Sequence, residues 1–236
     1  KKINQVVEGI EREEANRPKL SMTYWDGTDS VGHRYGTDHK KIFDQMVRQD
    51  QMLGLLFSRL TEIDAWDYVT LLLVSDHGMI NVNKYISLKD VLDSIEIDYI
   101  LSAGPAVAHI FIDDKAQRDE ALELLSRQDH MIAYRRENLP ASFHMNHPTR
   151  TGDLVVTTEP PYMFNNNPKD GPKGMHGYDP DLREMHAIFG AVGAGVRNER
   201  IGPIHMTDVA PTIAKLLEIK SVNHMQGRAI DLSPKD

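Results

Sequence analysis

One stretch of the chain sets the strongest limit on its fold. Residues 69–74 are all apolar or β-branched, and they end abruptly at Ser75, Asp76, His77 and Gly78. An apolar run of this length between polar residues predicts a fully buried β-strand. Asp76 and His77 then lie just past its C-terminal end, where open α/β sheets bind their ligands. Gly78 has no Cβ, so the chain can turn sharply there and direct both side chains to one point.

Length and composition narrow the class of protein. The 236 residues fit one large α/β domain or two small ones. The net charge of -8 and the lack of a basic run argue against binding to duplex nucleic acid, whereas a phosphate substrate stays compatible if metals supply positive charge. The chain has no cysteine, which excludes disulfides, thiolate nucleophiles and cysteine-type zinc sites. The longest apolar run, residues 187–196, contains three glycines and is too short to span a bilayer.

Hydrophobic periodicity and turn residues predict a series of alternating elements. Helices are expected at 3–10, from Thr37 or Asp38 to 64, and at 88–95, 116–128 and 208–217. Strands are expected at 20–25, 69–74, 98–101, 106–112, 131–134, 153–158 and 186–192, and loops at 26–33 and 160–177. This order predicts a three-layer α/β/α sandwich in one domain over residues 1–236, with a small mixed or antiparallel insert at about 95–150.

The residues that can bind a metal ion are concentrated in the predicted loops. They are Asp29, His33, Asp76, His77 and His176, and all five lie in glycine-containing loops next to predicted strand ends. Carboxylate and imidazole ligands without thiolate suit catalytic zinc, with manganese or iron as substitutes, and magnesium is disfavoured because it prefers oxygen ligands. Five ligands are too many for one open catalytic site and too few for two complete ones. We therefore expect two metals about 3.5–4 Å apart, with some ligands missing.

The same segments resemble a known family. Residues 24–36 read Tyr-x-Asp-x-x-Asp-Ser-x-Gly-His-x-Tyr-Gly, and they resemble the Tyr-x-Glu-x-Pro-Asp-x-x-Gly-His segment of nucleotide pyrophosphatases/phosphodiesterases, in the alkaline phosphatase superfamily. Ser75 to Met79 match the family's Ser-Asp-His-Gly-Met. Further segments follow in the family's order up to about residue 230: Gly104-Pro105, Arg150-x-Gly152-Asp153, Gly174-x-His176-Gly177 and Thr207-Asp208-x-Ala210-Pro211-Thr212.

The resemblance implies a role for each candidate ligand. Asp29, His33 and His176 would hold one zinc ion, and Asp76 and His77 would help to hold a second. The fold would be of alkaline phosphatase type with its N-terminal part absent. The family supplies a further aspartate and a nucleophilic threonine or serine upstream of these motifs. We therefore expect no catalytic nucleophile in this chain, and little or no activity from it alone.

The implied reaction is hydrolysis of phosphodiester or pyrophosphate bonds in nucleotides or related small molecules. It would proceed through a covalent phosphoenzyme intermediate. Tyr162 or Tyr178 would lie near the substrate. The family also implies an extracellular, membrane-anchored or periplasmic location.

Other functions stay open at the level of sequence. Within the superfamily the alternatives are a sulfatase, a cofactor-independent phosphoglycerate mutase or a phosphoethanolamine transferase. Outside it, the alternative is a non-catalytic extracellular interaction domain, which need not bind two zinc ions. Asp153 and Asp208 are predicted turn and cap residues. The remaining histidines are predicted to be structural or on the surface, with His186 the best candidate for burial: His39, His109, His130, His144, His147, His186, His205 and His224.

Overall fold

The chain forms two compact units. The structure is a computed structural model that describes residues 1–167, 171–220 and 225–234. The first unit comprises Lys1–Gly27, Asp44–Asp76 and Ala187–Asp236, and the second comprises Thr28–Phe43 and His77–His186. The expected single domain over residues 1–236 stays a prediction.

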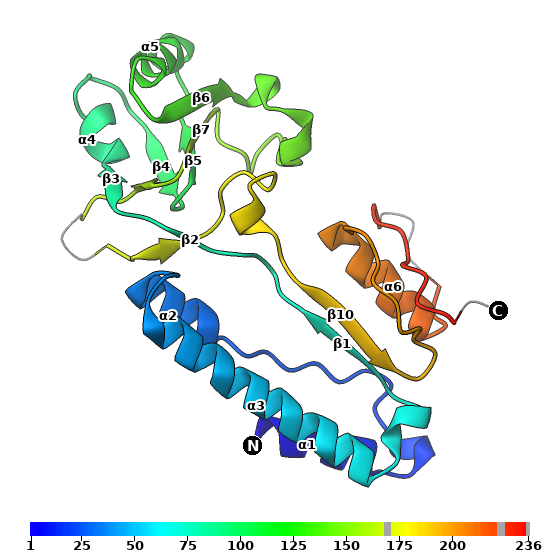
Figure 1. Ribbon diagram of the computed structural model, residues 1–236. Coiled ribbons are helices and arrows are strands. Elements are labelled where there is room, and N and C mark those ends of the chain that lie inside the picture. Colours follow the sequence, from blue (N-terminus) through cyan, green and yellow to red (C-terminus); the bar gives the residue numbers. More distant parts are fainter. Residues whose placement is uncertain (168–170, 221–224, 235–236) are drawn as a thin grey trace. The chain divides into compact units, whose positions relative to one another are not determined.

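The first unit packs helices around a small apolar core. Its elements are α1 (Lys2–Ile10), most of α3 (Lys40–Glu62), β1 (Thr70–Val74), β10 (Phe189–Gly193) and α6 (Val209–Leu216) (Figure 1). Ile3 and Val7 recur at helical spacing on α1, so they lie on one face of it. That face is buried in one cluster with Leu56 and Leu60 of α3. The predicted helices at 3–10, 37/38–64 and 208–217 are thus present, within a few residues at their ends.

The strand predicted at residues 69–74 is present as β1 but is not fully buried. β1 pairs antiparallel with β10, with Leu72 opposite Ala191. Leu73 and Val74 remain 37% and 45% exposed, so the prediction of full burial was wrong. Among the described residues β1 has only this one strand neighbour. A two-stranded sheet leaves much of its surface uncovered, which explains the exposure.

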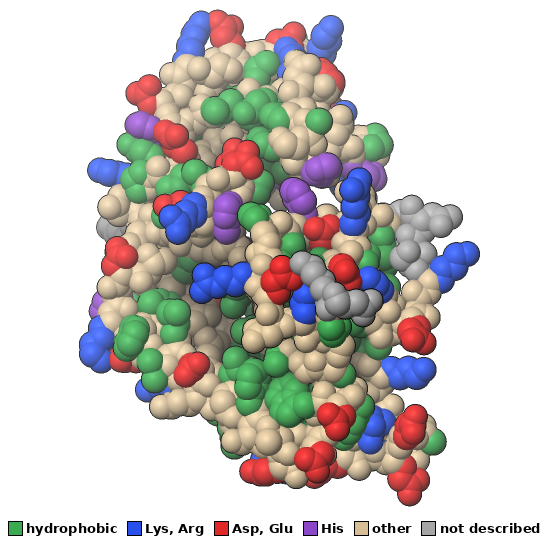
Figure 2. Space-filling model, turned by 45° about the vertical axis from the view of Figure 1, so that its right-hand side comes forward, with side chains coloured by type: hydrophobic (Ala, Val, Ile, Leu, Met, Phe, Trp, Pro, Cys, Tyr) green, Lys and Arg blue, Asp and Glu red, His purple; other side chains and the backbone are tan. Residues whose placement is uncertain are grey.

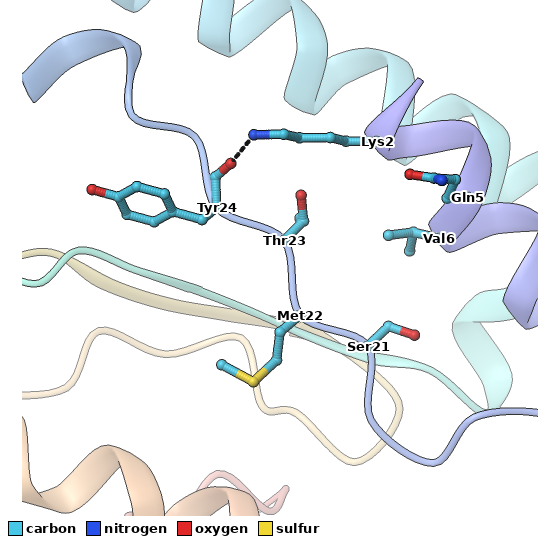
Figure 3. A pocket seen from close by; sticks show the side chains of 7 residues that line it. All are labelled: Lys2, Gln5, Val6, Ser21, Met22, Thr23 and Tyr24. Carbon is cyan, nitrogen blue, oxygen red and sulfur yellow. Dashed lines mark hydrogen bonds between the residues drawn. The ribbon is translucent and has the colours of Figure 1, made fainter. Parts of the chain in front are cut away.

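The strand predicted at residues 20–25 is absent. This segment has no regular secondary structure, and three of its apolar side chains are exposed: Leu20 at 49%, Met22 at 83% and Tyr24 at 61%. Alternation gives strand propensity, but a strand also needs a hydrogen-bonded neighbour. Instead, residues 21–24 line an open hollow of about 430 Å³ beside α1. There the Lys2 ammonium donates a 2.5 Å hydrogen bond to the Tyr24 carbonyl (Figure 3).

The second unit contains a four-stranded antiparallel sheet. The strands are β4 (Ile100–Ala103), β5 (Val107–Phe111), β6 (Met131–Arg135) and β7 (Leu154–Thr158), in the order β4-β5-β7-β6. Helices α4 (Leu88–Leu92) and α5 (Lys115–Ser126) pack against it (Figure 1). Leu92 and Leu125 share one buried cluster with Ile110 and Val156. Of the two predicted forms of the small insert sheet, the antiparallel one is correct.

Short strands link the rest of this unit to helix α2 (Gly27–Tyr35). β2 (Ile80–Asn81) pairs antiparallel with β9 (Gly174–Met175), and β3 (Lys84–Ile86) pairs in parallel with β8 (Tyr162–Phe164). The predicted loop at 160–177 therefore contains two strands.

Short 3₁₀ helices lie at Glu14–Asn16, Ala65–Asp67, Arg136–Asn138, Ala141–Phe143, Arg183–Met185 and Met206–Asp208.

The two predicted turn and cap residues do satisfy backbone donors. Asp153 accepts the Ile112 amide at 3.1 Å. Asp208 accepts the amides of Arg228 and His205, and these bonds hold its pKa below the ordinary value. Asp208 precedes α6, but its side chain does not cap that helix.

The histidines outside the candidate site are mostly exposed or half-buried, which agrees with the prediction of surface or structural roles, but the prediction for His186 was wrong. His186 is exposed rather than buried, because it precedes the strand β10 instead of lying within it. His224 lies outside the described residues.

His109 makes the stability of the second unit depend on pH. Its Nδ1 accepts the Gly152 amide at 3.3 Å, and burial lowers its pKa from 6.5. The folded state therefore binds this proton less readily than the unfolded state, so stability is lost as pH falls below about 6.5. We expect His109→Gln, which keeps an acceptor, to lose less Tm than the wild type between about pH 7 and pH 5. The exposed His186→Gln is the control, and equal pH profiles for all three proteins would contradict the prediction.

Candidate metal centre

Helix α2 presents two of the candidate ligands on one face. The sequence predicted a shaped loop here, because Gly27 and Gly32 flank the motif, and that prediction was wrong. Gly27 is the first residue of the helix, and Asp29 lies in its first turn, where the helix dipole favours a carboxylate. Asp29 and His33 are one turn apart, so their side chains point the same way.

Gly32 serves close packing rather than a turn. A Cβ on Gly32 would lie 2.3 Å from Met79 Sδ, and one on Gly174 would lie 2.6 Å from the Gly32 carbonyl oxygen. Because the Gly32 carbonyl oxygen is a backbone atom, only a residue without a Cβ at position 174 permits that approach. These two glycines therefore let α2 lie directly against β9. The contact is held by the Lys173 amide, which donates to the His33 carbonyl at 2.7 Å.

The pairing of β2 with β9 brings His77 and His176 together. His77 lies three residues before β2, and His176 directly follows β9. The two imidazole rings stack with centroids 3.6 Å apart and planes 16° apart. Gly78 is needed here for close approach, since a Cβ would lie 1.9 Å from the Glu184 carbonyl oxygen. Gly177 has φ +84, in the left-handed region that favours glycine.

The ligand atoms converge on Asp29. Its Oδ1 is 3.3 Å from His33 Nε2 and 3.7 Å from His176 Nε2. Asp29, His77 and His176 each offer one ligand atom within 4.8 Å of the others. The structure thus brings together four of the five predicted ligands, with Asp29 and His176 common to both groupings. Asp76 directly precedes His77 and is the last residue of the segment Asp44–Asp76 of the first unit, and its role as a ligand stays a prediction.

Hydrogen bonds fix two of the rings in a form suited to binding a metal. His33 Nδ1 bonds the Gly174 carbonyl at 2.9 Å, and His77 Nδ1 bonds the Gly78 carbonyl at 2.8 Å. A carbonyl oxygen can only accept, so each Nδ1 carries the proton. In the neutral ring the Nε2 lone pair is then the metal-binding group.

The environment of Asp29 fits a cation. Its Oδ1 is shielded from solvent and receives no hydrogen bond from the described residues. Burying a carboxylate oxygen without a hydrogen bond is unfavourable, and a coordinated cation would remove that cost. The donor set of one carboxylate and imidazole nitrogens is the set that zinc accepts.

The two tyrosines proposed near the substrate are hydrogen-bonded to each other. Tyr178 is buried, its hydroxyl donates to the Tyr162 carbonyl at 2.7 Å, and burial raises its pKa. That contact gives Tyr178 a structural role. The Tyr162 ring stacks on His130 at 3.9 Å, and its place near a substrate stays a prediction.

Comparison with known proteins decides the family. The model of the family described as "Type I phosphodiesterase / nucleotide pyrophosphatase" matches residues 1–179. The chain belongs to this type I phosphodiesterase/nucleotide pyrophosphatase family. The family shown is the one that the sequence motifs resembled, rather than one of the superfamily alternatives.

Several relatives in this family carry names of enzymes. The chain is 28% identical to a bis(5'-adenosyl)-triphosphatase, enpp4, of Xenopus laevis, over 85% of this chain and 44% of the relative. It is 30% identical to the human ectonucleotide pyrophosphatase/phosphodiesterase family member 5, over 87% and 43%. A venom phosphodiesterase of Naja atra is 24% identical over 95% and 29%. The chain thus spans less than half the length of these relatives.

Solved structures in the family share the fold. The human ectonucleotide pyrophosphatase/phosphodiesterase 5 superposes with a TM-score of 0.84 at 28% identity, over 94% of this chain and 59% of that one. A murine counterpart, an inactive variant in complex with AMP, gives 0.85 at 28% identity, over 95% and 60%. The predicted α/β fold of alkaline phosphatase type is confirmed, and the chain covers part of it.

The molecular surface is mixed in charge. Figure 2 shows acidic and basic side chains interspersed over one face of the molecule. Among the described residues, no helix is both long enough and apolar enough to cross a bilayer.

Proposed function

We propose that the chain forms the metal-binding part of a hydrolase that cleaves phosphodiester or pyrophosphate bonds of nucleotides or related small molecules. The observation that supports it most directly is the convergence of His33 Nε2 and His176 Nε2 on Asp29 Oδ1. In this proposal Asp29, His33 and His176 hold one zinc ion, and Asp76 and His77 contribute to a second. Manganese or another divalent metal can replace zinc.

The residues of this chain hold and orient the centre. Two bound cations would stabilise negative charge on the phosphate and on the attacking and leaving oxygens. The Nδ1–H bonds to Gly174 and Gly78 keep the His33 and His77 rings fixed, so little reorganisation is needed on binding. The five candidate ligands include no hydroxyl nucleophile. We assign the attack that forms a covalent phosphoenzyme to a residue other than these five.

The substrate class follows from the relatives. One is named a bis(5'-adenosyl)-triphosphatase, and another was solved in complex with AMP. These names favour a nucleotide as the substrate. The words "ectonucleotide" and "venom" in the relatives' names favour the extracellular location among those that the resemblance implied, which were extracellular, membrane-anchored or periplasmic.

Zinc titration of residues 1–236 tests the proposal. We expect zinc to bind and raise Tm, with about 2.7 kcal/mol of stabilisation when free zinc is 100-fold above its Kd. Magnesium should have little effect, because imidazole ligands do not suit it. Calorimetry and the metal content of the dialysed protein provide the measurement.

The same preparations test where the nucleophile lies. The zinc-loaded chain should hydrolyse a chromogenic phosphodiester no faster than free zinc ions do. A chain that takes up no zinc would overturn the proposal and favour a non-catalytic interaction domain. Robust turnover would show that the attacking group lies within these residues.

A further inference from the structure

Asn81 connects the two elements that carry the metal ligands. Its backbone lies in β2, directly opposite Gly174 of β9. The Gly174 carbonyl accepts the hydrogen bond from His33 Nδ1. Its side chain reaches the residues just after α2. There its Oδ1 accepts the Thr37 amide at 2.6 Å, and its Nδ2 donates to Asp38 Oδ2.

The end of α2 is built around this contact. The helix ends at Tyr35, and Gly36 follows with φ +85. The Gly36 amide still bonds the Gly32 carbonyl at 2.8 Å, so the turn is continuous with the helix. A Cβ on Gly36 would lie 2.7 Å from Asn81 Oδ1, which shows how closely the amide is packed against the backbone.

The two bonds require an amide side chain. One oxygen must accept from a backbone N–H while the other end donates to a carboxylate. Among short side chains, asparagine alone carries its acceptor oxygen and its donor nitrogen on two separate atoms, so it can bond Thr37 and Asp38 at the same time. An aspartate at this position could accept from Thr37, but it would place a second carboxylate against Asp38.

We propose that Asn81 is a positioning residue for the metal centre, which fixes α2, with Asp29 and His33, against the strand that leads to His176. The proposal rests on the metal site of the proposed function. Asn81 itself contacts no candidate ligand side chain by any of these bonds. Its effect passes through the backbone at Thr37 on one side and Gly174 on the other. Mutation of a residue that holds metal ligands in place typically lowers the affinity of the site for its metal by about 10–100-fold.

An exchange of the two side chains tests the inference on residues 1–236. We expect Asn81→Asp to weaken zinc binding by about 10–100-fold and to alter the visible spectrum of the cobalt-substituted protein. The double variant Asp38→Asn/Asn81→Asp restores one donor and one acceptor, so it should return both readouts close to wild type. Asn81→Ala, which adds no repulsion, should show the loss in a milder form. Asn83 is an exposed asparagine two residues further along the chain, and Asn83→Ala serves as the matched control.

The outcomes separate this inference from the proposed function. If the wild type binds zinc and Asn81→Asp and Asn81→Ala bind it within about threefold of the wild type, below the range for such partners, the inference is wrong. It is equally wrong if the exchange leaves the affinity as weak as Asn81→Asp alone, because the defect would then not come from the bond to Asp38. Wild-type protein that takes up no zinc overturns the proposed function itself.

Discussion

Asp29→Asn should weaken zinc binding by more than 100-fold while leaving the metal-free protein equally or more stable. This loss exceeds the roughly 10–100-fold typical of residues outside the coordination shell, because a ligand itself is removed. The gain in stability has a separate cause. Asp29 Oδ1 is shielded from solvent and receives no hydrogen bond from the described residues, so without a metal its charge is poorly compensated. An amide removes the charge at nearly unchanged shape.

The two effects have opposite signs, so they can be told apart from simple loss of folding. Zinc affinity is measured by competition with a chromogenic chelator, and stability is measured by urea unfolding after dialysis against chelator. Asp26→Asn is the matched control, since Asp26 is an exposed acid of the same motif. A variant that loses both zinc affinity and metal-free stability would indicate misfolding rather than loss of a ligand. Undiminished affinity would remove Asp29 from the centre.

The candidate ligands could be chosen from sequence because their chemistry is local. Asp76 and His77 follow an apolar run that forms β1, and Asp29 and His33 share one short motif. The conformation around them could not be chosen in the same way. Gly27 and Gly32 indicated a loop, yet Gly32 lies inside a helix, where its lack of a Cβ makes room for Met79 and Gly174. Those two neighbours lie more than 40 positions away in the sequence.

The connections that position the ligands were also out of reach. β2 and β9 have two residues each, too few to show any periodicity; β9 lies in a segment predicted as a loop, and no element was predicted at β2. Asn81 therefore carried no signal, since its partners Thr37 and Asp38 follow a different element. The segment at 20–25 shows the reverse case, in which a clear alternation produced no strand. Periodicity reports which faces can be buried, and pairing decides which are.

Gly78→Ala should destabilise the protein strongly, because the added methyl group would collide with the backbone. The new Cβ would lie 1.9 Å from the Glu184 carbonyl oxygen and 2.9 Å from that of His186. Both are backbone atoms, so they cannot rotate away as a flexible side chain would. The Gly78 amide also bonds the Met185 carbonyl at 3.0 Å, and this contact must open to make room. We expect a loss of about 3 kcal/mol, the upper end of typical overpacking costs.

The displacement should reach the metal centre as well as the fold. Gly78 directly follows His77, and its carbonyl holds the His77 ring, so movement of the backbone moves a ligand. In a chain of this size the loss corresponds to a Tm lower by roughly 6–12 °C. Zinc affinity should fall with it. Gly54→Ala is the control, since a Cβ there meets nothing within 4 Å inside α3, and alanine should stabilise that helix by about 0.5–1 kcal/mol. If Gly78→Ala retained wild-type stability, the backbone contact between Gly78 and Glu184 would not be what holds His77 in place.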